Sequence, residues 1–76
     1  MAYSSRKLYV IRNRKGQFLA GDRTHRKGRH WVEKLSKAKL YLNIHTVNRL
    51  VKLVRKELGD ESAYVTYGWF ELGERL

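Results

Sequence analysis

The sequence has no cysteine, few carboxylates and no long apolar run. Without cysteine, no disulfide and no thiolate-bound metal can reinforce the core, and nothing points to an oxidising compartment. No apolar run reaches the ~18 residues that crossing a bilayer requires, and no secretory segment stands near the start. These absences predict a cytoplasmic protein that does not enter a membrane.

Carboxylates are scarce and unevenly distributed. The 76 residues carry 17 Lys and Arg against 7 Asp and Glu, a formal net charge of +10. Residues 1–56 hold sixteen of the bases against Asp22 and Glu33, a net charge of +14, whereas residues 57–76 hold five carboxylates against Arg75, a net charge of −4. This excess predicts a negatively charged partner. A hydrophobic fraction of 42% argues against a disordered basic tail and favours one folded domain over residues 1–76.

A β-hairpin is predicted over residues 7–20, preceded by a loose lead-in at residues 1–6. Two β-rich stretches, residues 8–12 and 17–20, flank Asn13-Arg14-Lys15-Gly16, in which Gly16 can adopt the left-handed conformation that closes the turn. If Asn13 pairs with Gln17, the side chains divide into two faces. One face then carries Tyr9, Ile11 and Leu19, and the other carries Leu8, Val10, Phe18 and Ala20.

A helix is predicted over residues 44–58, with Asn43 as its N-cap and Gly59 ending it. Its apolar positions follow helical spacing: Ile44, Val47, Leu50, Val51, Val54 and Leu58. Residues 21–30 read as an exposed basic loop, residues 31–32 and 38–41 as short extended pieces, and residues 63–70 as a last strand. The order β-β-β-α-β predicts an α+β fold, a small antiparallel sheet with one helix packed on one face. A short helix over residues 33–40 would instead permit a helix-turn-helix.

One helix covers only one face of a sheet, which leaves two alternatives for the other face. It can expose apolar residues such as Val10 and Phe18 as an interaction patch, including one that joins two copies of the chain. Alternatively, the segment over residues 21–42 covers it, with Trp31 laid across that face.

The candidate binding residues are cations in the basic loop, at the hairpin tip and on the polar face of the helix. Arg and Lys bind phosphate oxygens and release condensed counterions. The residues are Arg14, Lys15, Arg23, Arg26, Lys27, Arg29, Arg49 and Lys52. Three aromatics, Phe18, Trp31 and Tyr64, are candidates for stacking or apolar contact, with packing in the core as the competing interpretation.

Nothing in the sequence indicates an enzyme, a cofactor or a metal centre. It has no nucleophile-base constellation and no glycine-rich phosphate loop. His25 and His30 stand five residues apart among Arg and Lys, which would repel a cation. Asp60 and Glu61 fit a solvated turn after the helix rather than an acid–base pair.

Residues 9–19, then Trp31, then residues 35–41 before a helix carry a family likeness. This arrangement resembles small bacteriophage-encoded proteins of unassigned role, which often have a strand-turn-strand, a tryptophan and an Ala-x-x-aromatic step before a helix. The resemblance implies a protein in the host cytoplasm that binds and blocks host machinery, such as transcription or CRISPR-type defence. Two functional hypotheses follow: binding of nucleic acid through its phosphates, or inhibition of a host protein through an acidic surface.

Overall fold

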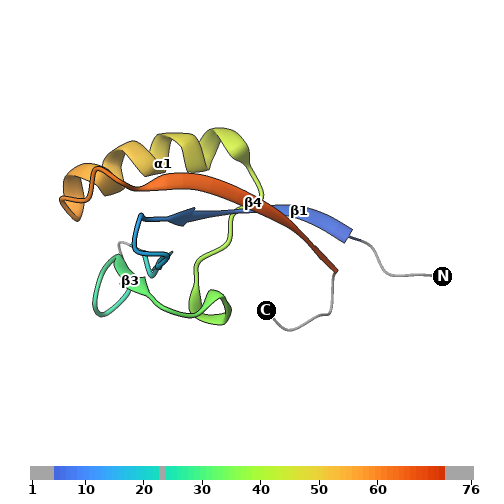
Figure 1. Ribbon diagram of the computed structural model, residues 1–76, viewed down its shortest axis with the longest axis horizontal. Coiled ribbons are helices and arrows are strands. Elements are labelled where there is room, and N and C mark those ends of the chain that lie inside the picture. Colours follow the sequence, from blue (N-terminus) through green and yellow to red (C-terminus); the bar gives the residue numbers. More distant parts are fainter. Residues whose placement is uncertain (1–4, 23, 72–76) are drawn as a thin grey trace.

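The protein is a four-stranded antiparallel sheet with one long helix on one face (Figure 1). The computed structural model describes the backbone of residues 5–22 and 24–71, and the side chains of residues 7–22 and 24–68. In chain order the elements are β1 (Ser5–Arg12), β2 (Phe18–Ala20), β3 (His30–Val32), the 3₁₀ turn η1 (Leu35–Lys37), α1 (Ile44–Glu57) and β4 (Tyr64–Glu71). The sheet order is β3-β2-β1-β4. The predicted α+β class is therefore confirmed.

The hairpin between β1 and β2 has the predicted register. Arg12 pairs with Phe18, and the Asn13 amide donates to the Gln17 carbonyl over 3.2 Å. Gly16 has a φ of +80°, and its amide donates to the Asn13 carbonyl. A left-handed residue at this position costs glycine little, so the sequence closes the turn without strain.

The longest strand pairing joins the two ends of the chain. β1 pairs with β4 over its full length, from Ser5 opposite Glu71 to Arg12 opposite Tyr64. The predicted lead-in is thus wrong for Ser5 and Arg6, which extend β1, and residues 1–4 lie outside the described residues. Two polar residues carry too little pattern to predict this, because their strand conformation comes from pairing with β4.

Helix α1 begins and ends where the sequence indicates. The Asn43 side chain accepts hydrogen bonds from the amides of His45 and Thr46, which satisfies two otherwise unpaired donors of the first turn. The helix ends at Glu57, and Gly59 follows with a φ of +64°. This is the left-handed conformation that commonly terminates a helix.

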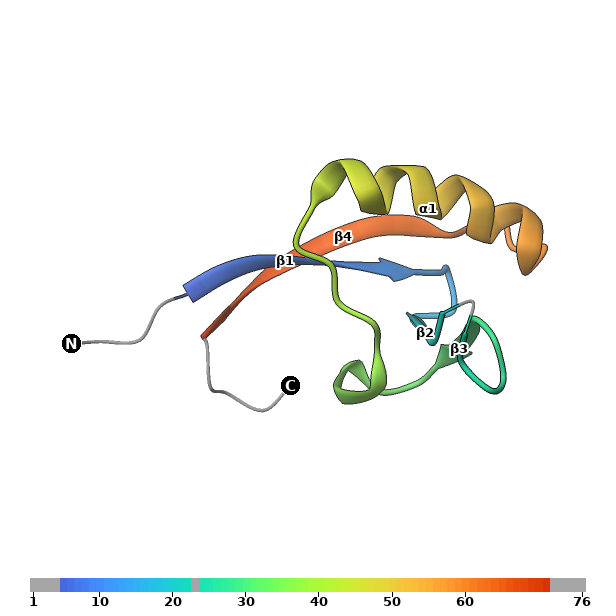
Figure 2. The same cartoon turned by 180° about the vertical axis from the view of Figure 1, so that it is seen from behind.

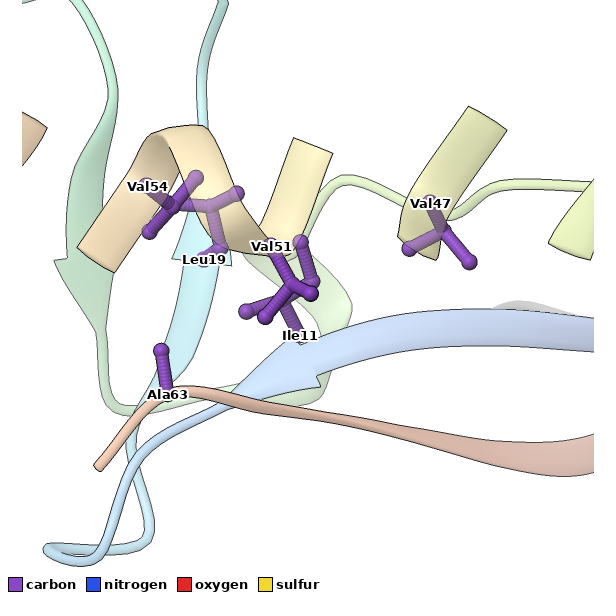
Figure 3. Close-up of a cluster of buried hydrophobic side chains, with 6 residues drawn as sticks. All are labelled: Ile11, Leu19, Val47, Val51, Val54 and Ala63. Carbon is purple, nitrogen blue, oxygen red and sulfur yellow. The ribbon is translucent and has the colours of Figure 1, made fainter. Parts of the chain in front are cut away.

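The core lies between α1 and the β1–β2 part of the sheet (Figure 3). Its buried members are Ile11, Leu19, Val47, Val51, Val54 and Ala63. Tyr9, Trp31 and Val65 pack against them from the sheet, and Ile44, Leu50 and Leu58 from the helix and its end. The apolar helical face and one face of the hairpin therefore meet as their spacing predicts.

The segment between β3 and α1 covers part of the other face of the sheet. Figures 1 and 2 show the green η1 turn on the side opposite α1. Leu35 of η1 lines a groove with Val10, Arg12 and Phe18, and Val10 is only 5% exposed. The cover predicted from residues 21–42 is thus present in part, but Trp31 does not supply it. Trp31 pairs with Leu19 and packs on the helix side.

The chain then passes between β1 and β2 to reach α1 (Figure 2). The Lys39 amide donates to the Leu19 carbonyl of β2 over 2.9 Å, and Tyr41 exchanges two backbone hydrogen bonds with Tyr9 of β1. β1 and β2 share the single pair Arg12–Phe18, so residues 39–41 fill the space where the two strands diverge. The extended piece predicted at residues 38–41 has this role, and residues 33–40 form only the 3₁₀ turn η1, which is too short for a helix-turn-helix.

Within residues 5–22 and 24–71, no helix combines the length and apolar character that a membrane crossing requires.

Candidate functional site

The basic tip of the β1–β2 hairpin is docked against the turn that follows α1. Arg14 and Lys15 are exposed, while the Arg14 amide donates to the Ser62 hydroxyl over 3.0 Å. Asp60 accepts from the Ser62 hydroxyl and amide, and these bonds, with the charge of Lys15, lower the pKa of Asp60 below 3.8. The charge at this tip is therefore partly balanced by a carboxylate that stays ionised.

The basic loop between β2 and β3 is a closed, hydrogen-bonded unit rather than an irregular segment. Asp22 accepts from the amide and the hydroxyl of Thr24 over 2.8 and 2.7 Å, and its own carbonyl accepts from the His25 amide. The Gly28 amide donates to the His25 carbonyl over 2.8 Å. Gly21 closes the loop, because a Cβ at this position would lie 2.4 Å from the Gly28 carbonyl oxygen.

Two histidines lie side by side in this loop. The ring centroids of His25 and His30 are 5.2 Å apart. The Lys27 amide donates to Nδ1 of His25, so neutral His25 carries its proton on Nε2. Nδ1 of His30 lies 2.8 Å from the Gly28 carbonyl oxygen and must donate to it. Loop hydrogen bonds thus assign opposite tautomers to the two neutral rings.

A pocket of about 460 Å³ opens beside the two histidines. Its cationic lining comes from three separate segments: Lys27 from the loop, Lys37 from η1 and Lys39 from the segment between β1 and β2. Asp22 is the one carboxylate among its lining residues, and its Oδ2 lies 3.8 Å from Nζ of Lys39. The hydrogen bonds from Thr24 lower the pKa of Asp22 below 3.8. The pocket therefore has an excess of positive charge despite this carboxylate.

A second groove, of about 420 Å³, runs between the same segment and α1. Asp22 and Lys39 line both hollows, so the two are neighbours. Arg49 adds a cation from the helix, and Leu53, 47% exposed, adds an apolar surface. Burial raises the pKa of Tyr41 above 10.0 in this groove, so its hydroxyl stays protonated at neutral pH.

The structure brings some of the predicted cations together and separates others. Arg26 and Lys27 are exposed in the loop, and Arg49 and Lys52 are exposed on α1. Arg23 lies outside the described residues. The hairpin tip with Arg14 and Lys15 precedes β2, whereas the loop follows it, so the tip and the loop lie at opposite ends of this strand rather than on one edge.

Arg29 forms an ion pair within the fold. Its Nη1 lies 3.1 and 3.0 Å from the two carboxylate oxygens of Glu57, and its side chain is only 13% exposed. The predicted phosphate contact at this position would have to compete with an ion pair inside the fold.

The three candidate stacking residues lie in different environments. Trp31 is part of the packing against the core. Phe18 is covered by the guanidinium of Arg12, whose Cζ lies 4.6 Å from the ring centroid. Tyr64 is 43% exposed, and so is available for contact. Tyr67 is 58% exposed on β4, and Nζ of Lys7 lies 4.0 Å from the centroid of its ring.

The sequence did not predict that Lys37 and Lys39 lie beside the basic loop. Nothing in the sequence relates these two positions to His25 or Lys27, because only the path of the chain through the sheet brings them together.

Comparison with protein-family models, with curated proteins and with solved structures returns no match. The likeness to small phage proteins thus stays a prediction. Among the described residues, no three His, Cys, Asp or Glu side chains gather in a way that could hold a metal ion.

Proposed function

We propose that this protein binds nucleic acid through its phosphate groups, without catalysing a reaction. The observation that carries the proposal is the cationic lining of two neighbouring hollows. Lys27, Lys37 and Lys39 surround the first, and Arg49 extends the charge over α1. Cations held on different elements around neighbouring hollows can contact successive phosphates together.

The charge of the whole molecule supports the same function. A net charge of +10 on 76 residues attracts a polyanion over several ångströms and accelerates encounter. Among the described residues, salt bridges engage only Arg29 and Lys39. Exposed cations such as Arg26, Lys27 and Lys52 therefore keep charge to offer a partner.

Salt-dependent binding tests the proposal directly. Fluorescence anisotropy with labelled duplex DNA, single-stranded DNA and RNA would follow the dissociation constant between about 50 and 200 mM salt. Contact with about five phosphates predicts a log–log slope of roughly −4.5 on a duplex and roughly −3.5 on a single strand. A flat salt response, or no binding at the lowest salt, would refute nucleic-acid binding.

A second candidate function, inhibition of a host protein through an acidic surface, is favoured by one observation. The second groove places exposed Leu53 beside Leu50 and Arg49, an apolar strip flanked by positive charge. Such a strip fits a protein partner with an acidic rim and an apolar centre. Capture of one discrete host protein after nuclease treatment, with Leu53→Glu abolishing capture, would support this function over the first.

A further inference from the structure

One wall of the pocket beside His25 and His30 is held in place by contacts within the loop, whereas the three lysines of its lining are exposed side chains. Gly21 and Gly28 approach so closely that a side chain on Gly21 has no room. Hydrogen bonds within the loop fix both imidazole rings. Because this wall is ordered in advance, a ligand has to order only the lysine side chains when it binds.

The charges of the lining residues indicate which ligand would neutralise the pocket. Lys27, Lys37 and Lys39 contribute three positive charges and Asp22 one negative charge, so the lining has a net charge of +2 when both histidines are neutral. A phosphodiester has one negative charge, whereas a phosphate monoester has about −1.5 to −2 at neutral pH. The monoester is therefore the better electrostatic match.

His25 adds a donor suited to the same group. Neutral His25 has its proton on Nε2, since its Nδ1 is occupied by the Lys27 amide. His30 is held beside it by the bond between its Nδ1 and the Gly28 carbonyl. Charge-assisted hydrogen bonds to an ionised phosphate are stronger than neutral ones.

We propose that this pocket binds a terminal phosphate monoester, so that the protein prefers nucleic-acid ends that carry a phosphate over ends that carry a hydroxyl. The inference rests on the proposed function and narrows it to one class of strand end. A volume of about 460 Å³ lies within the range of small-molecule sites, and so has room for the terminal nucleotide as well as its phosphate.

The test compares two oligonucleotides of one sequence, one with a 5′-phosphate and one with a 5′-hydroxyl, both labelled at the 3′ end. We expect the 5′-phosphorylated strand to bind about tenfold tighter, the effect of one or two charged hydrogen bonds. A 3′-phosphorylated strand shows whether the pocket distinguishes the two ends. Adenosine monophosphate should displace the 5′-phosphorylated strand, and adenosine should not, because the two competitors differ only in the phosphate group that the pocket is proposed to bind.

A pair of matched double variants assigns the preference to the pocket. Lys27→Ala with Lys37→Ala removes two exposed lysines of the lining, and the preference for the phosphorylated strand should fall to about twofold or less. Lys34→Ala with Lys56→Ala removes the same charge from exposed positions away from both hollows and should keep the preference.

The results separate the two proposals. Equal binding of both strands by the wild-type protein, with a steep salt dependence, overturns the end-recognition inference and leaves general nucleic-acid binding in place. A preference that survives in the pocket variant and disappears in the control also overturns the inference. Binding of neither strand removes the proposed function as well.

Discussion

Arg29 and Glu57 join the base of the basic loop to the last turn of α1 through an ion pair in which Nη1 lies 3.0 Å from Oε2. A carboxylate at the C-terminal end of a helix is unfavourable, because it adds to the partial negative charge there. Arg29 reverses this effect and holds the loop against the helix. The carboxylate of Glu57 thus helps to hold the basic loop in place.

Replacing Glu57 with Gln should lower the free energy of unfolding by up to about 1 kcal/mol, the range for a partly exposed ion pair. Urea unfolding at low and high salt measures the effect, which should shrink as salt screens the pair. Glu61→Gln, a change on the exposed turn beyond the helix, is the control and should stay within about 0.5 kcal/mol of wild type. Equal losses in both variants would contradict a specific role for the ion pair.

Asn13 should be the most sensitive polar position of the hairpin. It is 1% exposed, and its Oδ1 accepts from the amides of Lys15 and Gln17 over 3.0 Å each. Asn13→Ala leaves both donors without this partner and should cost about 1–3 kcal/mol in thermal or urea unfolding. Asn48→Ala, on the exposed face of α1, should cost nothing. A neutral effect at Asn13 would mean that water replaces its oxygen.

Gly21 and Gly28 offer a matched pair in the basic loop. Both have positive φ, +76° and +66°, but a Cβ on Gly21 would meet the Gly28 carbonyl whereas a Cβ on Gly28 meets nothing within 4 Å. Gly28→Ala should cost only the left-handed backbone term, about 1–2 kcal/mol. Gly21→Ala should cost clearly more, and should also weaken binding at the pocket. Thermal unfolding of both variants checks the difference, and identical losses would refute it.

The lowered pKa of Asp60 predicts that the free energy of unfolding falls at acid pH. Its folded pKa lies below 3.8, so the charged form stabilises the fold above that pH, and the stabilisation is lost as the pH falls through the folded pKa. Wild type should be more stable than Asp60→Asn at neutral pH, and the gap should close as the pH falls from neutral to below 3.8. Urea unfolding across this range measures it. A gap that stays constant would contradict the depressed pKa.

Sequence periodicity was sufficient for the elements whose contacts are local. The Asn13–Gly16 turn, the register that places Ile11 and Leu19 on one face, and the start of α1 at Asn43 all follow from residues within a few positions of each other. Each depends on turn chemistry, period-2 alternation or capping, which act over short distances.

The features that depend on distant segments could not be predicted. The pairing of Ser5 and Arg6 with β4, the passage of Lys39 and Tyr41 between two strands, and the assembly of the pocket each join residues without a shared pattern.

The path of residues 39–41 between β1 and β2 affects how the protein unfolds. The strands of a hairpin normally separate from the rest of a protein as one local unit, but here their inner edges are occupied by a third stretch of chain that leads directly into the helix. Because this stretch is hydrogen-bonded to both strands and continues into the helix, we expect neither the helix nor the hairpin to unfold without breaking those hydrogen bonds. The molecule should therefore melt in one cooperative step, with helix and sheet signals disappearing at the same temperature.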